Sequence, residues 1–170
     1  MPYILNLKEN KVYNTIIVSP PGRGKTTLLR DIVRNISNGI KELNFKGVNV
    51  GVVDERGEIA AMYKGIPQND LGERTDILDN ISKDLGIKML VRSMNPRVVV
   101  ADEIGTKEDI EAIHYAVTSG VNGIFTAHGD SLNDIILNPI LGKMYNLKLI
   151  DKIILIKENR EIELIWDKYK

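Results

Sequence analysis

Apolar and β-prone residues along this chain form short continuous runs that alternate with runs of helical spacing. The continuous runs predict buried strands at 15–18, 46–53, 97–101 and 122–127. Apolar residues spaced three and four positions apart predict helices at 28–38, 82–95 and 106–119. Strands that alternate with helices in this way favour an α/β fold with a mostly parallel, doubly wound sheet covered on both faces.

The last third of the chain predicts shorter elements. Ser131 is a suitable N-cap for one short helix, and Pro139 is typical of the start of another. Two β-prone runs, 152–156 and 162–166, predict a C-terminal antiparallel hairpin. Residues 57–81 carry glycines and a proline among polar residues, so we expect a long irregular connection there.

Composition narrows the class of protein. The 170 residues suit a single domain, 1–170, and 43% hydrophobic residues are enough for a packed core. Lys+Arg and Asp+Glu balance at 23 each, so net charge gives no attraction to nucleic acid or anionic lipid. The chain has no cysteine, no signal-peptide pattern and no apolar run long enough to span a membrane. We expect a soluble, cytoplasmic protein.

The most informative segment joins the first predicted strand to the first helix. It reads Ser19-Pro20-Pro21-Gly22-Arg23-Gly24-Lys25-Thr26-Thr27 and matches a phosphate-binding loop in its expected strand–turn–helix context. Backbone N–H groups at a helix N-terminus attract anions, and the helix dipole adds to this attraction. Lys25 can reach the β- and γ-phosphates of ATP, and the Thr26 hydroxyl can bind Mg²⁺. The segment therefore predicts ATP and Mg²⁺ as cofactors.

One position of this loop departs from the usual pattern. Ser19 stands where the pattern begins with glycine. If this position needs a left-handed backbone, serine costs roughly 1–2 kcal/mol, and otherwise it costs little. Gly22 and Gly24 remain where the loop has to lie close to phosphate, so we interpret the loop as functional.

A second nucleotide motif lies at the end of the third predicted strand. Apolar residues at 98–101 lead directly into Asp102 and Glu103. We expect Asp102 to hold Mg²⁺ through its water shell and Glu103 to act as the base that aligns the attacking water. A base at this position favours hydrolysis over a simple nucleotide switch.

Other polar residues also follow predicted strands. His128 comes after 122–127, and we expect it to sense the γ-phosphate, whereas His114 lies mid-helix and is expected to be structural. Glu55 and Glu58 could order Mg²⁺ or the attacking water, or they could be solvated loop acids. An arginine finger would stabilise charge on the transferring phosphoryl group. The candidates for it are Arg56, Arg74, Arg92 and Arg97, among which the sequence does not choose.

Several segments, in this order along the chain, resemble one protein family. They are 20–31, 53–59 around Asp54-Glu55-Arg56, 72–79, 90–96 with Arg92-Ser93-Met94-Asn95-Pro96, 102–105 and 126–129. From about residue 15 to 156 the chain resembles the ATPase core of the stage III sporulation protein AA family. That family is in turn similar to the ATPases of type II and type IV secretion systems.

The resemblance implies a P-loop NTPase of the RecA-like, additional-strand class. It assigns the extra strand between the two nucleotide motifs to 48–53, an acidic box to Asp54-Glu55-Arg56 and a histidine box to Thr126-Ala127-His128. It implies a homo-oligomer, a hexameric ring, that acts on the mother-cell side of a channel between two compartments of a sporulating bacterium, with membrane channel proteins as partners. The family's separate N-terminal domain, which helps build such rings, is not expected within 1–170.

Two other function classes stay open at this point. The first is an ATP-dependent nucleic-acid motor of recombinase type, although neutral charge and 5% aromatic residues offer few phosphate patches or stacking platforms. The second is an assembly module that binds nucleotide without hydrolysing it. A salt-dependent shift on single-stranded DNA would indicate the first, and a phosphate-release assay separates the second from an ATPase.

Overall fold

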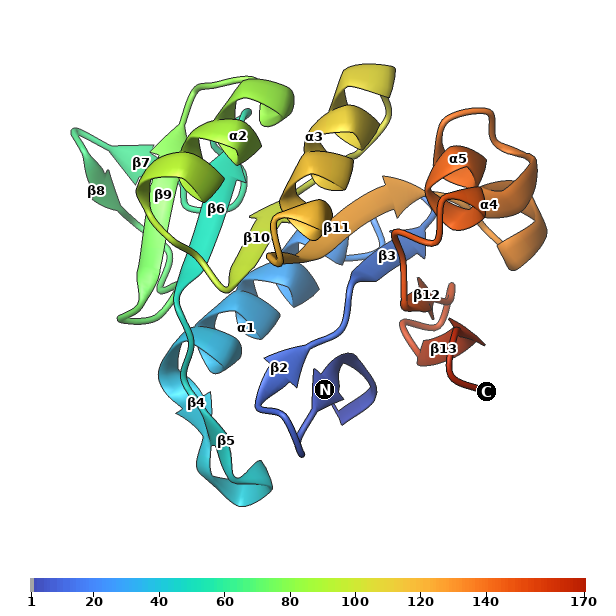
Figure 1. Ribbon diagram of the computed structural model, residues 1–170, viewed down its shortest axis with the longest axis horizontal. Coiled ribbons are helices and arrows are strands. Elements are labelled where there is room, and N and C mark those ends of the chain that lie inside the picture. Colours follow the sequence, from blue (N-terminus) through green and yellow to red (C-terminus); the bar gives the residue numbers. More distant parts are fainter. Residues whose placement is uncertain (1) are drawn as a thin grey trace.

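The computed structural model describes residues 2–170, which are built around a seven-stranded sheet (Figure 1). Its strands follow the order β13-β12-β3-β11-β10-β6-β9. Their bounds are Thr15–Ser19 (β3), Val50–Asp54 (β6), Thr75–Asp79 (β9), Val98–Ala101 (β10), Asn122–His128 (β11), Lys152–Ile156 (β12) and Ile162–Asp167 (β13). All neighbours from β12 to β9 pair in parallel, and β13 pairs antiparallel with β12. The mostly parallel α/β sheet and the C-terminal hairpin are thus confirmed.

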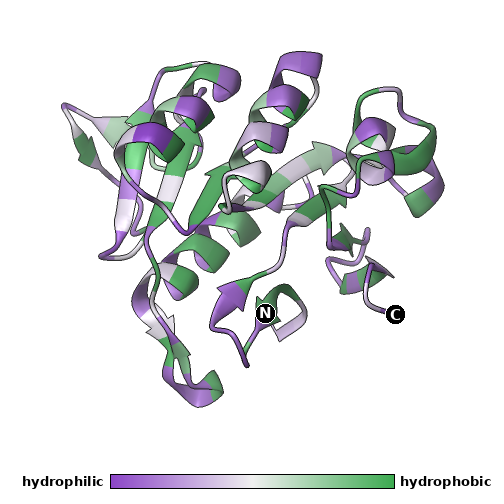
Figure 2. Ribbon diagram, viewed as in Figure 1, coloured by the Kyte–Doolittle hydropathy of each residue, from purple (hydrophilic) through white to green (hydrophobic). Residues whose placement is uncertain are grey.

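Helices cover both faces of the sheet. They are α1 (Lys25–Asn38), α2 (Lys83–Ser93), α3 (Lys107–Thr118), α4 (Leu132–Leu137) and α5 (Leu141–Asn146). Side chains of β10 alternate between the faces, so that Val98 and Val100 pack with α1, whereas Val99 packs with α2 and α3. Figure 2 shows hydrophobic residues along the central strands and hydrophilic residues on the outward sides of α2 and α3.

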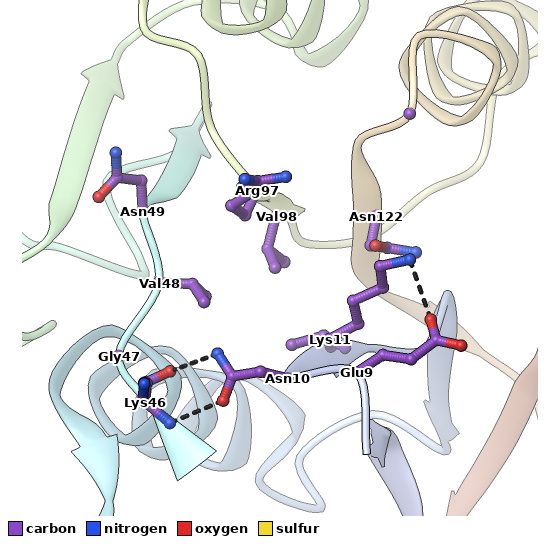
Figure 3. A pocket seen from close by; sticks show the side chains of 12 residues that line it. Glu9, Asn10, Lys11, Lys46, Gly47, Val48, Asn49, Arg97, Val98 and Asn122 are labelled. Carbon is purple, nitrogen blue, oxygen red and sulfur yellow. Dashed lines mark hydrogen bonds and ion pairs between the residues drawn. The ribbon is translucent and has the colours of Figure 1, made fainter. Parts of the chain in front are cut away.

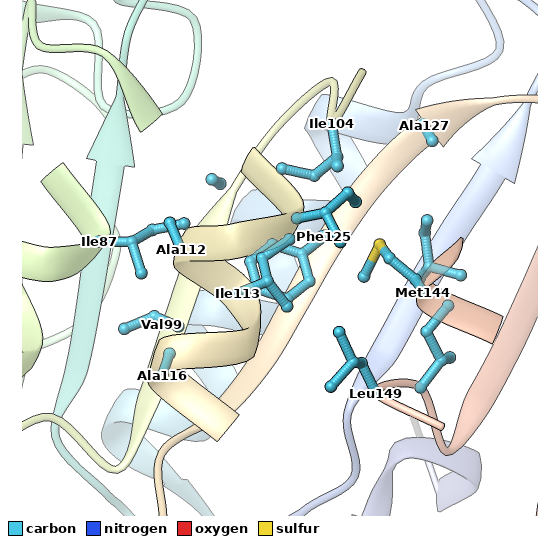
Figure 4. Packing of buried hydrophobic residues seen from close by; sticks show 14 of the residues in the cluster. Ile87, Val99, Ile104, Ala112, Ile113, Ala116, Phe125, Ala127, Met144 and Leu149 are labelled. Atoms are coloured by element: carbon cyan, nitrogen blue, oxygen red, sulfur yellow. The ribbon is translucent and has the colours of Figure 1, made fainter. Parts of the chain in front are cut away.

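Close packing sets the position of the helices above β10 and β11. Ala112 and Ala116 are fully buried and let α3 approach the sheet, where Phe125 fills the space beside Ile113 (Figure 4). A Cβ atom on Gly86 would come within 2.6 Å of Val53, so glycine allows α2 to lie directly on β6. These contacts hold the carboxyl ends of β6, β10 and β11 at one edge of the sheet.

Three two-stranded hairpins and two 3-10 turns surround this core. The hairpins are β1 (Leu5–Asn6) with β2 (Lys11–Val12), β4 (Gly39–Ile40) with β5 (Phe45–Lys46), and β7 (Met62–Tyr63) with β8 (Ile66–Pro67). The 3-10 turns are η1 (Pro2–Ile4) and η2 (Lys41–Leu43). Within residues 2–170, no helix combines the length and the apolar character that crossing a bilayer requires.

Helix boundaries agree with the sequence patterns. The Thr106 side chain caps α3 by accepting from the Asp109 N–H (3.1 Å), and the Asp109 carboxylate accepts in return from the Thr106 N–H (3.0 Å). Ser131 caps α4, as expected, by accepting from the Asp134 N–H (3.2 Å). Each cap satisfies backbone N–H groups that the helix itself cannot.

Two expectations about strands were wrong in detail. The segment 57–81 is not wholly irregular, because it contains β9, an edge strand paired only with β6. Its two aspartates, Asp76 and Asp79, are exposed, which explains why no continuous apolar run marks it. The strand expected at 46–53 begins at Val50, because Lys46 pairs with Gly39 in the β4–β5 hairpin and the Val48 N–H bonds to α1.

The strand that lies between the two nucleotide-motif strands is β11, not the segment 48–53. In the sheet, β11 separates β3 from β10, and β6 lies on the far side of β10. The expected assignment followed chain order, whereas neighbours in a doubly wound sheet are set by helical crossovers. As a result, His128 at the end of β11 pairs directly with Ser19 at the end of β3.

Candidate functional site

The Gly-rich loop, Pro20–Gly24, leaves the carboxyl end of β3 and leads directly into α1. Gly22 and Gly24 have φ of 74° and 93°, values that glycine adopts without steric cost. Ser19 is the last residue of β3 and does not have a positive φ, so a serine at this position does not carry the energetic cost of a left-handed backbone. The first bond of the helical ladder joins the Leu28 N–H to the Gly24 carbonyl (2.9 Å). The N–H groups of residues 25–27 precede that ladder and form the anion-attracting end of α1.

Lys25 lies within the curve of this loop. Its Nζ donates to the carbonyls of Ser19 (3.0 Å) and Pro20 (3.2 Å) and to Ser19 Oγ (3.2 Å). It also lies 3.2 Å from Nδ1 of His128. Burial lowers the pKa of Lys25 from its usual value, and the Glu103 carboxylate partly offsets this by raising it. The loop therefore holds its one lysine at the position where a phosphate chain would meet α1.

The outer residues of the segment remain accessible. Pro21, Gly22, Gly24 and Thr27 are exposed, and Thr26 is half-buried. Arg23 turns away from the loop and donates through its guanidinium to the Glu158 carbonyl (3.4 Å) and carboxylate (3.3 Å). The segment predicted to bind phosphate thus combines one buried cation with an open backbone surface.

Asp102 is buried at the end of β10, with 2% of its surface exposed. Burial, reinforced by the neighbouring carboxylates of Asp54 and Glu103, raises its pKa from 3.8 to about 6. Its Oδ2 is buried and has no hydrogen-bond partner among the described residues. Such an oxygen fits a magnesium-bound water, since a partner there would satisfy the atom and stabilise the charge.

Residues 2–170 contain no group of three acidic or histidine side chains arranged around a metal. Mg²⁺ in nucleotide sites is held by one or two protein oxygens, substrate phosphates and water, so a site for it does not need such a group. That Thr26 and Asp102 hold Mg²⁺ stays a prediction.

Glu103 follows Asp102 and has an unusual backbone conformation. Its φ is +47°, in the left-handed region that costs a non-glycine residue of order 1 kcal/mol or more. Its N–H donates to Oγ1 of Thr126 (2.8 Å) on β11, and the next residue donates its N–H to the Thr126 carbonyl (2.8 Å). These two bonds hold the strained turn and fix Glu103 at the edge of the loop.

The Glu103 carboxylate has two cationic or polar neighbours. One oxygen pairs with the Arg56 guanidinium, and the other lies 3.5 Å from Nε2 of His128. Because the Lys25 ammonium can only donate, Nδ1 of His128 accepts, and Nε2 carries the hydrogen that faces Glu103. Lys25, His128 and Glu103 thus form a continuous polar chain from the loop to the predicted base.

The Asp54-Glu55-Arg56 segment divides between structural and site roles. Asp54 is fully buried and accepts from the N–H groups of Ile59 (3.1 Å) and Ala60 (2.7 Å), so it fixes the turn after β6. Glu55 pairs with Lys83, which is buried in the first turn of α2. Only Arg56 reaches Glu103. The sequence pattern did not identify Lys83 as a site residue. The feature that could have marked it is a lysine at the start of a predicted helix.

The remaining candidates lie elsewhere. Arg74 donates to the Ser37 carbonyl (3.2 Å), Arg92 lies over the Tyr115 ring at 5.9 Å, and Arg97 lies at the start of β10. Within one copy of the chain, Arg56 is therefore the only one of the four arginines that contacts Glu103. Glu58 is exposed and accepts from Arg30 through its backbone carbonyl, and His114 is exposed on α3.

A cavity of about 550 Å³ lies at the opposite edge of the sheet (Figure 3). It is lined by the β1–β2 hairpin, residues 46–49 and the starting residues of β10 and β11. In the lining of this cavity, the Asn10 side chain hydrogen-bonds to the Lys46 backbone, and Lys11 pairs with Glu9. The candidate site is at the Gly-rich loop and not in this larger cavity, because the strained Glu103 and the buried Asp102 follow β10, and Glu103 is connected through His128 to Lys25 at the end of the loop.

Comparison with known proteins assigns the family. The sequence profile of the family described as sporulation stage III, protein AA matches residues 1–170. The chain belongs to this family. It is 44% identical over 151 residues to stage III sporulation protein AA of Bacillus subtilis, covering 89% of this chain and 48% of that protein. It is 30% identical over 132 residues to the uncharacterized protein ycf45 of Porphyra purpurea, covering 76% of this chain and 22% of that protein.

Solved structures show that this family member has the fold of secretion ATPases. The VirB11 ATPase of the Brucella suis type IV secretion system, in complex with sulphate, aligns with a TM-score of 0.60 at 14% identity, covering 96% of this chain and 50% of that chain. The pilus retraction motor PilT with bound ADP aligns with a TM-score of 0.55 at 16% identity, covering 89% and 48%. The Legionella pneumophila ATPase DotB aligns at 0.54 and 15% identity, covering 94% and 46%.

Proposed function

We propose that this member of the sporulation stage III protein AA family is an ATP-binding and ATP-hydrolysing motor domain. The observation that carries the proposal is the polar chain from Lys25 through His128 to Glu103, which runs beside the unpaired carboxylate of Asp102. The chain joins the end of a phosphate-binding loop to a base and a metal ligand, and these are the parts that phosphoryl transfer to water requires.

Binding of ATP rests on the loop. The Lys25 ammonium would exchange its bonds to the Ser19 and Pro20 carbonyls for the β- and γ-phosphate oxygens, which carry more charge and accept more strongly. The N–H groups of residues 25–27 would bind phosphate at the helix N-terminus. Thr26 Oγ1 and Asp102 would hold Mg²⁺, which supplies positive charge to the phosphates when it is bound.

Hydrolysis rests on Glu103 and its neighbours. Water attacks the γ-phosphorus, Glu103 accepts a proton from that water, and the bond to the β–γ bridging oxygen breaks to leave ADP and phosphate. His128 lies between Lys25 and Glu103, so loss of the γ-phosphate would change its contacts and report the reaction to β11. Arg56 pairs with the Glu103 carboxylate, and this pairing supports it as the arginine that would stabilise the developing charge. Glu55 would contribute only indirectly, through its ion pair with Lys83.

The family and the fold support a biological role in sporulation. We infer that the domain drives transport through, or assembly of, a channel between mother cell and forespore, working as a homo-oligomeric ring on the cytoplasmic side with membrane channel proteins as partners. The supporting facts are the 44% identity to the Bacillus subtilis protein and the shared fold with a type IV secretion ATPase and a pilus retraction motor. The chain spans about half the length of that relative, 48%.

Nucleotide binding by a Lys25→Ala variant tests the proposal. We expect it to lose detectable binding of ATP and Mg²⁺ in calorimetry, because it lacks the one buried cation of the segment 19–27. The matched control is Lys41→Ala, which removes an exposed lysine from the η2 turn and should bind ATP like the parent protein. Unchanged ATP affinity in Lys25→Ala would exclude the loop as the phosphate site.

A further inference from the structure

Strand β3 has a different neighbour on each side, and only one side carries the reactive groups. His128 at the end of β11 and Asp102 and Glu103 at the end of β10 lie on the same side. A γ-phosphate near Lys25 and His128 therefore points toward β11. The opposite end of the triphosphate, which carries the nucleoside, must leave the loop on the other side, toward β12 and the β12–β13 hairpin.

A cavity of about 310 Å³ lies on that side, next to the loop. We call it the hairpin cavity, and its lining residues are Pro20, Asp130, Leu155, Ile156, Lys157 and Glu158. Pro20 belongs to the Gly-rich loop itself, so the cavity borders the phosphate site directly. Leu155 is paired with Val18 of β3, which places the cavity at the level of the loop's first residues.

The lining of the hairpin cavity combines apolar residues, the acidic residues Asp130 and Glu158, and Lys157, which pairs with Glu163 (2.9 Å). Pro20 and Leu155 are partly exposed and offer apolar surface to the face of a base. The carboxylates of Asp130 and Glu158 can accept hydrogen bonds from ribose hydroxyls or an exocyclic amine. Ligand cavities begin at roughly 300 Å³ and pair apolar walls with a few polar groups. A nucleoside meets that description, because its base needs apolar surface and its ribose hydroxyls need hydrogen-bond acceptors.

Two contacts hold the cavity walls in place beside the loop. The Gly129 N–H donates to the Ser19 carbonyl (3.4 Å), which positions Asp130 at the start of the loop. Arg23 reaches across to the carbonyl (3.4 Å) and the carboxylate (3.3 Å) of Glu158 and so ties the loop to the hairpin. Arg23 is half-buried and Glu158 is exposed, so this tie positions the hairpin and adds little to stability.

We infer that the hairpin cavity is the nucleoside subsite of this protein and binds the base and ribose of ATP or ADP. Leu155 contacts the base, and Asp130 accepts from the ribose. The inference rests on the proposed function, because it requires the triphosphate to occupy the Gly-rich loop. It predicts that changes in this cavity alter the affinity for nucleosides joined to phosphate and leave the affinity for the phosphate chain alone unchanged.

The test compares ATP with tripolyphosphate, both with Mg²⁺, by calorimetry on the full chain. Leu155→Ala should weaken ATP binding about tenfold, and Asp130→Ala about threefold, with tripolyphosphate affinity unchanged within about twofold. Leu164→Ala is the matched control, since Leu164 is a partly buried leucine of the same hairpin that packs on the other face of the sheet and does not line the cavity. Asp130 is exposed, so its variant tests the cavity even if Leu155→Ala folds poorly.

The outcomes separate this inference from the proposed function. If the parent binds tripolyphosphate and both cavity variants bind ATP like the parent, the nucleoside lies elsewhere and the inference is wrong. Equal weakening of ATP and tripolyphosphate would show that the cavity acts only through the loop, which also overturns it. If the parent binds neither ligand, the proposed function fails first, and the inference fails with it.

Discussion

Replacement of Asp102 by Asn should stabilise the ligand-free protein and abolish its Mg²⁺-dependent affinity for ATP. The reason is that the surroundings of Asp102 destabilise its ionised form. Its carboxylate is buried, its Oδ2 has no partner among the described residues, and Asp54 and Glu103 add negative charge nearby. Asparagine has nearly the same shape but no charge, so the variant relieves this cost and removes the carboxylate that we propose holds Mg²⁺.

The magnitude follows from the shift in the Asp102 pKa. A rise from 3.8 to about 6 is about 2 pKa units, which corresponds to about 3 kcal/mol of folding free energy at full ionisation. Solvent relaxation reduces this, so we expect a gain of about 1–3 kcal/mol for the variant near pH 7.5. Well below pH 3.8 the aspartate is protonated in both folded and unfolded chains, so the gain should vanish there, and only a small part of it should remain at about pH 4. In the parent, the unfolding free energy should therefore fall as pH rises from about 4 to about 6, because Asp102 ionises more readily in the unfolded chain than in the folded protein.

Urea denaturation at about pH 4 and about pH 7.5 measures this difference in unfolding free energy. Asp76→Asn serves as the control, because Asp76 is exposed on the edge strand β9 and should show no such pH-dependent gain. Calorimetry with ATP and Mg²⁺ completes the assay. The reasoning is refuted if Asp102→Asn is less stable than the parent near pH 7.5, or if it binds ATP with undiminished dependence on Mg²⁺.

Two further predictions concern His128 and the cap of α3. His128→Ala should bind ATP almost normally but abolish the difference in hydrogen exchange across residues 122–134 between an ATP analogue and ADP, whereas His114→Ala should keep it. A parent without that difference would rule out the sensor role. Thr106→Ala should lower unfolding free energy by about 1 kcal/mol through loss of the α3 cap, with ATP affinity unchanged, and urea denaturation with calorimetry checks both. An effect on ATP affinity alone would contradict the structural role of Thr106.

The sequence predicted the sheet and the loop well, because both follow from local pattern. Continuous apolar runs are required for strands buried on both faces, and these runs located β3, β10 and β11. The turn after β3 was equally clear, since Gly22 and Gly24 are needed for positive φ. The apolar pattern did not predict edge strand β9, because one side of this strand faces solvent and a short polar segment can therefore occupy the position.

Other features of the site could not be predicted because they depend on contacts between distant segments. Nothing local distinguishes Arg56 from Arg74, yet only Arg56 meets Glu103, once β6 and β10 lie side by side. The pairing of Glu55 with Lys83 likewise depends on α2 packing against β6. The position of β11 between β3 and β10 follows from crossover geometry, and chain order therefore misassigned the intervening strand.

We propose that Glu103 is the base of an ATP-hydrolysing site. Phosphate release by the parent, by Glu103→Gln and by the exposed-residue control Glu108→Gln, at matched ATP saturation, tests it most directly. We expect the parent and Glu108→Gln to release phosphate at the same rate. Glu103→Gln should bind ATP normally yet release phosphate about 10²–10⁴-fold more slowly. Equal rates in the parent and Glu103→Gln, or ATP binding by the parent without any phosphate release, would contradict it.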